Sequence, residues 1–88
     1  MNDSDMISHH LMKIISESTA PVCIAMMVDY IKSDAKYVGC KVVSHRIGKS
    51  ATYIIFKSRE DLNLYLLVGN HKENDRLKFC VAGEEPWK

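Results

Sequence analysis

Hydrophobic residues recur at helical spacing near the start of the chain. The apolar positions that share one helical face are Ile7, Leu11, Ile14 and Ile15. This spacing predicts an amphipathic helix over residues 5–17, and Asp3 and Ser4 before it are typical of a helix N-terminus.

A second helix is predicted from Pro21, a residue suited to the first helical turn. Apolar residues then continue to Ile31, before Lys32 and Ser33 end the run. They surround most of the helix, which is the pattern of a buried helix, while a buried strand over residues 22–28 is the competing interpretation.

After Gly39 the hydrophobic period changes to two, which indicates β-strands. Strands are predicted at residues 41–47 and 51–58, joined at Gly48-Lys49 by a two-residue type II′ turn. This turn pairs Val43 with Ile54 and Val42 with Ile55.

Alternation continues through residues 62–68 and 77–82, with a polar connection at residues 70–75. These segments predict a second hairpin, in which Leu66 faces Phe79 across the sheet.

The expected fold is therefore α+β. Two N-terminal helices pack on one face of a four-stranded antiparallel sheet made of two hairpins. Residues 1–88 are expected to form one small domain, with residues 83–88 as an irregular C-terminal tail. A winged-helix-like arrangement, with helices at residues 6–33 and the first hairpin as the wing, is the alternative.

Charge is strongly segregated along the chain. Residues 36–59 carry six basic side chains and no acidic one, whereas residues 1–35 sum to −3 and residues 60–88 to −2. Such a segment predicts a local surface that attracts phosphates or an acidic protein.

Other sequence features point away from catalysis, cofactors and metals. Gly48-Lys49-Ser50 resembles the end of a phosphate-binding loop, but Val43 stands where that motif needs glycine. The four histidines and three cysteines have no zinc-ligand spacing, and no nucleophile has a reason to meet a base. We therefore expect no enzyme, no cofactor and no metal, and a small enzyme is the least favoured alternative.

The cysteine pattern and the absence of a long apolar run favour a cytoplasmic protein with no membrane contact.

The sheet face opposite the helices is predicted to be unusually apolar. The proposed registers place these residues on it: Val42, Ser44, Arg46, Ala51, Tyr53, Ile55, Lys57, Tyr65, Leu67, Arg76, Lys78 and Cys80. One interpretation is that the first helix or the C-terminal tail covers part of this face. The other is that it binds a partner.

The favoured function is a small non-catalytic interaction protein that binds and modulates a macromolecular partner, either another protein or a second copy of itself. Tyrosine, arginine and large apolar side chains are typical of interface cores. The predicted partner-binding residues are Arg46, Tyr53, Ile55, Lys57, Tyr65, Leu67, Lys78 and Trp87.

The alternative is a nucleic-acid-binding regulator, in which cations follow phosphates and tyrosines stack on bases. Its predicted contacts are Lys36, Lys41, Arg46, Lys49, Tyr53, Lys57 and Arg59.

Overall fold

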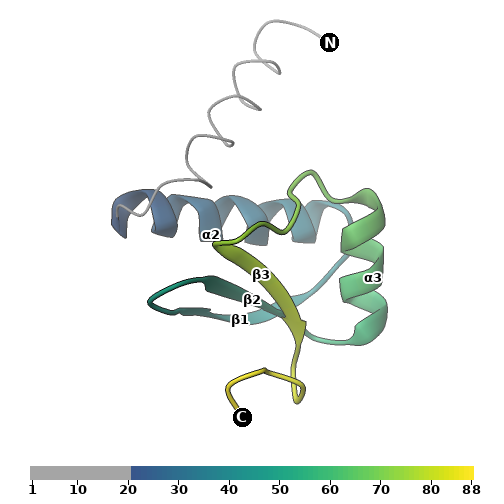
Figure 1. The fold of residues 1–88 in the computed structure, drawn as a ribbon. Helices are drawn as coiled ribbons and strands as arrows, with labels where there is room; N and C mark the ends of the chain where they lie inside the picture. Colours follow the sequence, from purple (N-terminus) through teal and green to yellow (C-terminus); the bar gives the residue numbers. More distant parts are fainter. Residues whose placement is uncertain (1–20) are drawn as a thin grey trace, which may run out of the picture.

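A computed structural model describes residues 21–88 of the protein. The helix predicted at residues 5–17 lies outside the described residues. In chain order the elements are α2 (Pro21–Tyr37), β1 (Val42–Ile47), β2 (Thr52–Phe56), α3 (Arg59–Val68) and β3 (Leu77–Val81) (Figure 1).

Within the described residues helix α2 spans Pro21–Tyr37, so it runs past the predicted end at Lys32. Gly39 stops it by adopting a positive φ of 89°, a conformation that glycine tolerates without strain. The Gly39 amide donates to the carbonyl of Lys36 and the Cys40 amide to that of Ala35, at 3.2 and 2.8 Å. These two bonds form a Schellman motif and satisfy helix carbonyls that would otherwise lack partners.

Strands β1 and β2 confirm the predicted first hairpin, but its register differs by two residues. His45, not Val43, lies opposite Ile54. The ladder continues past Ile47, because the Gly48 amide donates to the Ala51 carbonyl at 2.8 Å. The chain therefore reverses one residue later than predicted. Gly48 also lacks the positive φ that a type II′ turn requires at its first central position.

The predicted second hairpin is wrong, because residues 59–68 form helix α3 rather than a strand. Ser58 is its N-cap, with Oγ accepting a 3.2 Å bond from the Asp61 amide. Glu60 and Asp61 in the first turn are favourable at the positive end of the helix dipole. This leucine-rich segment has the alternation of a strand but forms a helix, and the cap at Ser58 is the local feature that favours the helix.

Within residues 21–88 the sheet consequently has three strands in the order β1-β2-β3, and it is mixed. β1 is antiparallel to β2, whereas β3 is parallel to β2, with Ile54 beside Phe79. Parallel neighbours need a crossover connection, which α3 supplies. The four-stranded antiparallel fold is therefore incorrect. The winged-helix alternative is incorrect too, because a helix follows the hairpin and leads to a parallel strand.

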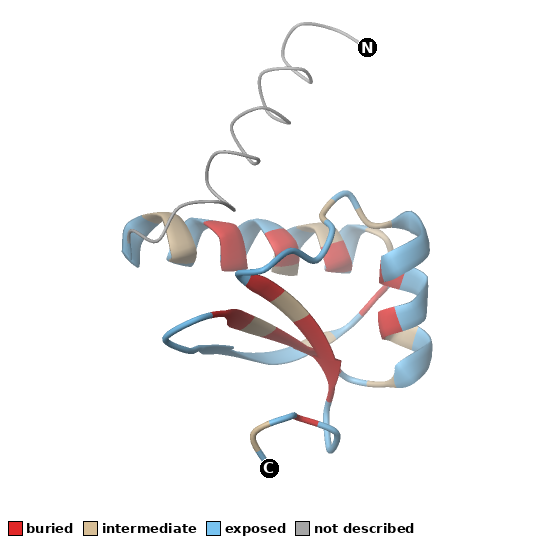
Figure 2. Ribbon diagram, viewed as in Figure 1, coloured by how far each residue is buried: buried red, intermediate tan, exposed pale blue. Residues whose placement is uncertain are grey.

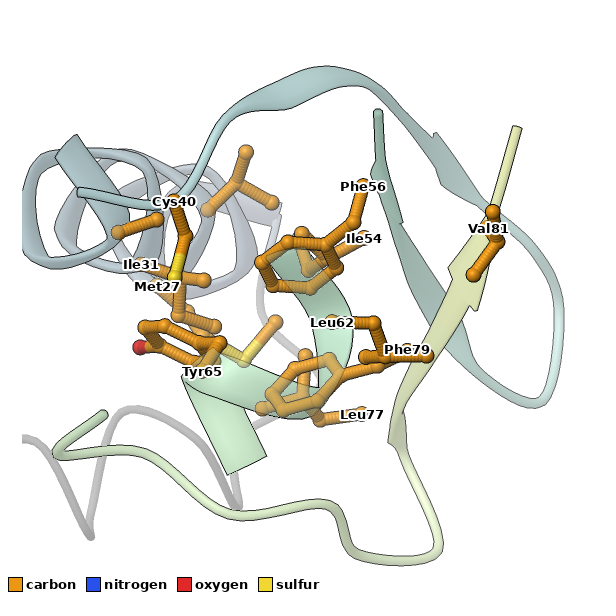
Figure 3. Packing of buried hydrophobic residues seen from close by; sticks show 12 residues of the cluster. Met27, Ile31, Cys40, Ile54, Phe56, Leu62, Tyr65, Leu77, Phe79 and Val81 are labelled. Carbon is orange, nitrogen blue, oxygen red and sulfur yellow. The ribbon is translucent and has the colours of Figure 1, made fainter. Parts of the chain in front are cut away.

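Both described helices contribute to a core on one face of the sheet. In Figure 3 the rings of Phe56, Tyr65 and Phe79 meet between α3 and the strands, with centroids 5.3 to 5.6 Å apart. Met27 and Ile31 of α2 belong to the same buried cluster. Large buried side chains of the core therefore come from four of the five described elements, and Val42 of β1 packs against them.

The predicted contact of Leu66 with Phe79 is also wrong. Phe79 is buried, but Leu66 lies on α3 and is 39% exposed.

Candidate partner-binding site

The sheet face opposite the helices keeps only part of its predicted composition. Arg46 lies opposite Tyr53, and Tyr53 lies beside Lys78. Tyr65 and Leu67 do not belong to this face, because they are in α3. Tyr65 is fully buried in the core, while Leu67 is 78% exposed.

The C-terminal tail covers much of what remains. The rings of Trp87 and Tyr53 form a T-shaped contact with centroids 4.9 Å apart, and the Arg46 guanidinium lies 4.6 Å from the Trp87 ring centroid. Ile55 is only 6% exposed, and Glu85 of the tail is also buried. In the structure the C-terminal tail therefore covers part of this face, which was one of the two interpretations drawn from the sequence.

Several predicted nucleic-acid contacts are occupied within the chain. Tyr53 packs against the Trp87 ring, so part of its aromatic surface is already in contact within the chain. Arg59 forms a 2.9 Å salt bridge with Glu84. Lys49 is exposed near the tip of the hairpin, and Lys57 is exposed after β2.

The edge of the sheet at β3 is protected by side chains of the preceding loop. Asn74 Oδ1 accepts a 2.9 Å bond from the Leu77 amide. Glu73 Oε2 accepts a 3.1 Å bond from the Phe79 amide. These amides point away from β2, and both are satisfied without another strand. Nothing in the hydrophobic pattern indicated this protection.

The opposite edge, at β1, has no such protection within residues 21–88. In an antiparallel pair, residues alternately exchange backbone bonds with the partner strand or face away from it. The bond from Gly48 fixes this alternation. The backbone N–H and C=O groups of Arg46 and Ser44 therefore point toward β2, while those of His45 and Ile47 point away from it. No described residue bonds the outward backbone groups of His45 and Ile47.

Exposure agrees with this geometry. In Figure 2 β1 is pale blue along most of its length, whereas β2 is mostly red. Val43 and Ile47 are 46% and 53% exposed although both are large and apolar. The register of β1 shifts between Val42 and Ser44, and residues 44–47 pair regularly with β2. A regular stretch with unpaired backbone groups and exposed apolar side chains can add a further strand.

A basic hollow lies at the start of this edge. Its volume is about 520 Å³, and its lining is Lys32, Lys36, Gly39, Cys40, Lys41, Val42 and Val43. We call it the lysine hollow. Among the described residues, three lysines and no acidic side chain line it, so it favours an anionic group. Lys32 lies outside the basic segment predicted from sequence and reaches the hollow only through the fold.

The pKa shifts of two titratable groups near β1 favour their uncharged forms. Burial lowers the pKa of His45, and the charge of Lys32 lowers it further, although Asp29 acts in the opposite direction. Burial raises the pKa of the Cys40 thiol, with smaller contributions from Asp61 and Asp34. Cys40 is therefore a poor nucleophile in this environment.

Within residues 21–88 there is no group of three or more metal-ligating side chains. No helix in the same range is long and apolar enough to cross a membrane. Comparisons with known protein families, with curated proteins and with solved structures gave no match. The geometry at β1 is consequently the main guide to function.

Proposed function

We propose that this protein is a small non-catalytic interaction protein that binds an extended segment of a protein partner along β1. The observation that carries the proposal is the contrast between the two sheet edges. Side chains satisfy the outward amides of Leu77 and Phe79, but the outward groups of His45 and Ile47 have no partner among the described residues.

The β1 edge is suited to strand addition in three respects. It is six residues long, close to the usual length of a strand, and its last four residues, 44–47, pair with β2 without interruption. Its outward-facing residues alternate with residues bonded to β2, so a partner strand can bond without disturbing the hairpin. Val43 and Ile47 offer exposed apolar surface to the side chains of that strand.

This mode differs from the one predicted from sequence, in which the whole outer face of the sheet met the partner. Trp87 and the tail already occupy part of that face. Nucleic acid is less favoured for a related reason, since Tyr53, Arg46 and Arg59 are engaged in contacts within the chain.

Proline substitution separates backbone recognition from side-chain recognition. His45→Pro removes an outward amide and leaves the bonds to β2 intact, and edge strands tolerate proline at such positions. His45→Ala removes the same imidazole but keeps the amide. Ile47→Pro provides a second edge variant in case the first one unfolds.

The experiment is to select binders from a phage-displayed library of random peptides, with the full chain as bait. Selected peptides are then titrated by fluorescence anisotropy. We expect His45→Ala to bind, and His45→Pro and Ile47→Pro to lose about tenfold or more in affinity, because the ring removes a donor and obstructs the incoming strand.

Amide hydrogen exchange supplies an independent signature. A bound peptide should slow exchange at His45 and Ile47 and leave the already bonded Ser44 and Arg46 nearly unchanged. Failure to select any peptide, or equal binding by the alanine and proline variants, would overturn the proposal.

A further inference from the structure

The lysine hollow specifies what kind of segment β1 would bind. It lies at the beginning of the strand, since Lys41, Val42 and Val43 belong to both the hollow and the start of the edge. Lys32 and Lys36 reach it from α2, one helical turn apart. A strand added beside β1 would pass this group of cations.

The side chains of β1 itself strengthen the positive character of the edge. Lys41 precedes the strand, Arg46 lies within it and Lys49 follows it. Asp29 contributes a negative charge near this edge, since it acts to raise the pKa of His45. Lys32 acts on His45 in the opposite direction to Asp29. Among the described residues near this edge, the lysines of the hollow therefore outnumber Asp29.

These charges argue against a second copy of the chain as the occupant. An antiparallel pairing of two β1 strands centred on His45 would place each His45 opposite its counterpart and bring the Lys41 end of each strand near the Lys49 end of the other. Like charges directly opposite each other destabilise a strand pair. The edge is therefore matched to a strand of the opposite charge.

We infer that the partner segment is acidic, and that one of its carboxylate side chains lies in the lysine hollow while its backbone bonds to His45 and Ile47. This inference rests on the proposed strand addition. Side chains alternate between the two sides of a strand, so every second residue of the segment faces the α2 side, where Lys32 and Lys36 lie. A carboxylate there accepts charge-assisted bonds from lysine ammonium groups.

The test uses three labelled ten-residue peptides in which threonine alternates with glutamate, glutamine or lysine. Their common alternation keeps strand propensity similar while the charge changes. The glutamate peptide should bind several-fold more tightly than the glutamine peptide, and the lysine peptide should bind least. Raising the salt concentration to about 0.5 M should shrink the difference, because exposed charge pairs are screened.

A double variant locates the charge effect. Lys32→Gln/Lys36→Gln should weaken the glutamate peptide by about 3- to 10-fold, the range expected for two partly exposed ion pairs, and leave the glutamine peptide unchanged. Lys72→Gln/Lys78→Gln removes the same charge away from the hollow and serves as the control. It should have little effect on either peptide.

The possible failures are distinguishable. Equal binding of the glutamate and glutamine peptides, lost in both by His45→Pro, would overturn the acidic preference and leave strand addition standing. Binding of the glutamate peptide that survives His45→Pro would overturn strand addition. Binding of a single-stranded oligothymidylate that survives His45→Pro but is lost in Lys32→Gln/Lys36→Gln would assign the hollow to nucleic acid and overturn this inference.

Discussion

The hydroxyl of Tyr65 donates a 2.7 Å hydrogen bond to Oδ2 of Asp34, and so joins α3 to α2 at the edge of the core. The same carboxylate accepts bonds from the backbone and side-chain amides of Asn70, at 2.9 and 2.7 Å. One partly buried acid therefore ties together α2, α3 and the loop that leads to β3.

Replacing Tyr65 by phenylalanine removes the bond to Asp34 but keeps the ring against Phe56 and Phe79. We expect a loss of about 1.5–3 kcal/mol in the free energy of unfolding, the usual range for a hydrogen bond to a charged group. Urea denaturation of the two proteins measures it. Tyr65→Asp should unfold the protein, whereas Leu67→Asp on the exposed side of α3 should change stability by less than about 0.5 kcal/mol. Unchanged stability of Tyr65→Phe would contradict the role assigned to this bond.

The Asp34 network predicts a loss of stability in acid. Burial would raise the pKa of Asp34, but bonds from Asn70 and Tyr65 outweigh it and hold the pKa below the ordinary value of 3.8. Since the folded pKa is the lower one, the contribution is complete above 3.8 and disappears as the pH falls through the folded pKa. Unfolding free energies measured across this interval should fall more steeply for the wild type than for Asp34→Asn. Parallel curves would contradict the prediction.

Alanine substitutions distinguish the observed fold from the four-stranded one. Phe79→Ala should cost about 3–5 kcal/mol, because Phe79 is buried among aromatic rings. Leu66→Ala should cost less than about 1 kcal/mol, because this side chain is exposed on α3. In two antiparallel strands both residues would be core neighbours. Comparable losses measured by thermal or urea unfolding would therefore favour the rejected hairpin.

The start of α3 depends on its cap. Ser58→Ala removes the acceptor of the Asp61 amide and should cost about 1 kcal/mol. Ser50→Ala, in the exposed turn between β1 and β2, is the matched control and should be nearly neutral. Chemical denaturation of both variants compares them. Equal effects would mean that the cap does not stabilise the helix.

The tail contact can be tested through Trp87. Trp87→Ala removes the ring that packs on Tyr53 and lies beside Arg46. We expect a loss of about 1–2 kcal/mol from reduced apolar burial, together with increased binding of a hydrophobic dye to the uncovered sheet face. Trp87→Phe should retain most of the contact and bind less dye. If truncation to alanine changes neither quantity, the tail does not protect this face.

The features that the sequence predicted correctly depend on local patterns. The apolar run after Pro21 lies in α2, and alternating apolar residues define β1 and β2. The basic segment is visible as composition, and two of its lysines, Lys36 and Lys41, line the hollow. Turn position was predicted one residue too early, and the resulting register shift of two keeps residues 44–47 on their predicted faces. Val42 is an exception, because the register shifts between Val42 and Ser44 and Val42 lies opposite Phe56 on the core face.

Residues 59–68 show how two local signals can conflict. Their leucines alternate as in a strand, yet Ser58 followed three residues later by Asp61 is a capping signature that predicts a helix. That signature predicts a crossover helix at residues 59–68 in place of the first strand of the second hairpin. Parallel pairing of β3 with β2 then follows, since a helix between two strands readily carries the chain back to the same end of the sheet.

The candidate site depends on contacts between distant parts of the chain. Loop residues Glu73 and Asn74 close the β3 edge, Trp87 covers part of the outer face, and Lys32 joins Lys41 across the end of α2. Periodicity and composition report which residues are apolar or charged within a segment. They do not report which backbone amides another segment satisfies, because that depends on how the segments pack, and so the open β1 edge was decided by the tertiary structure alone.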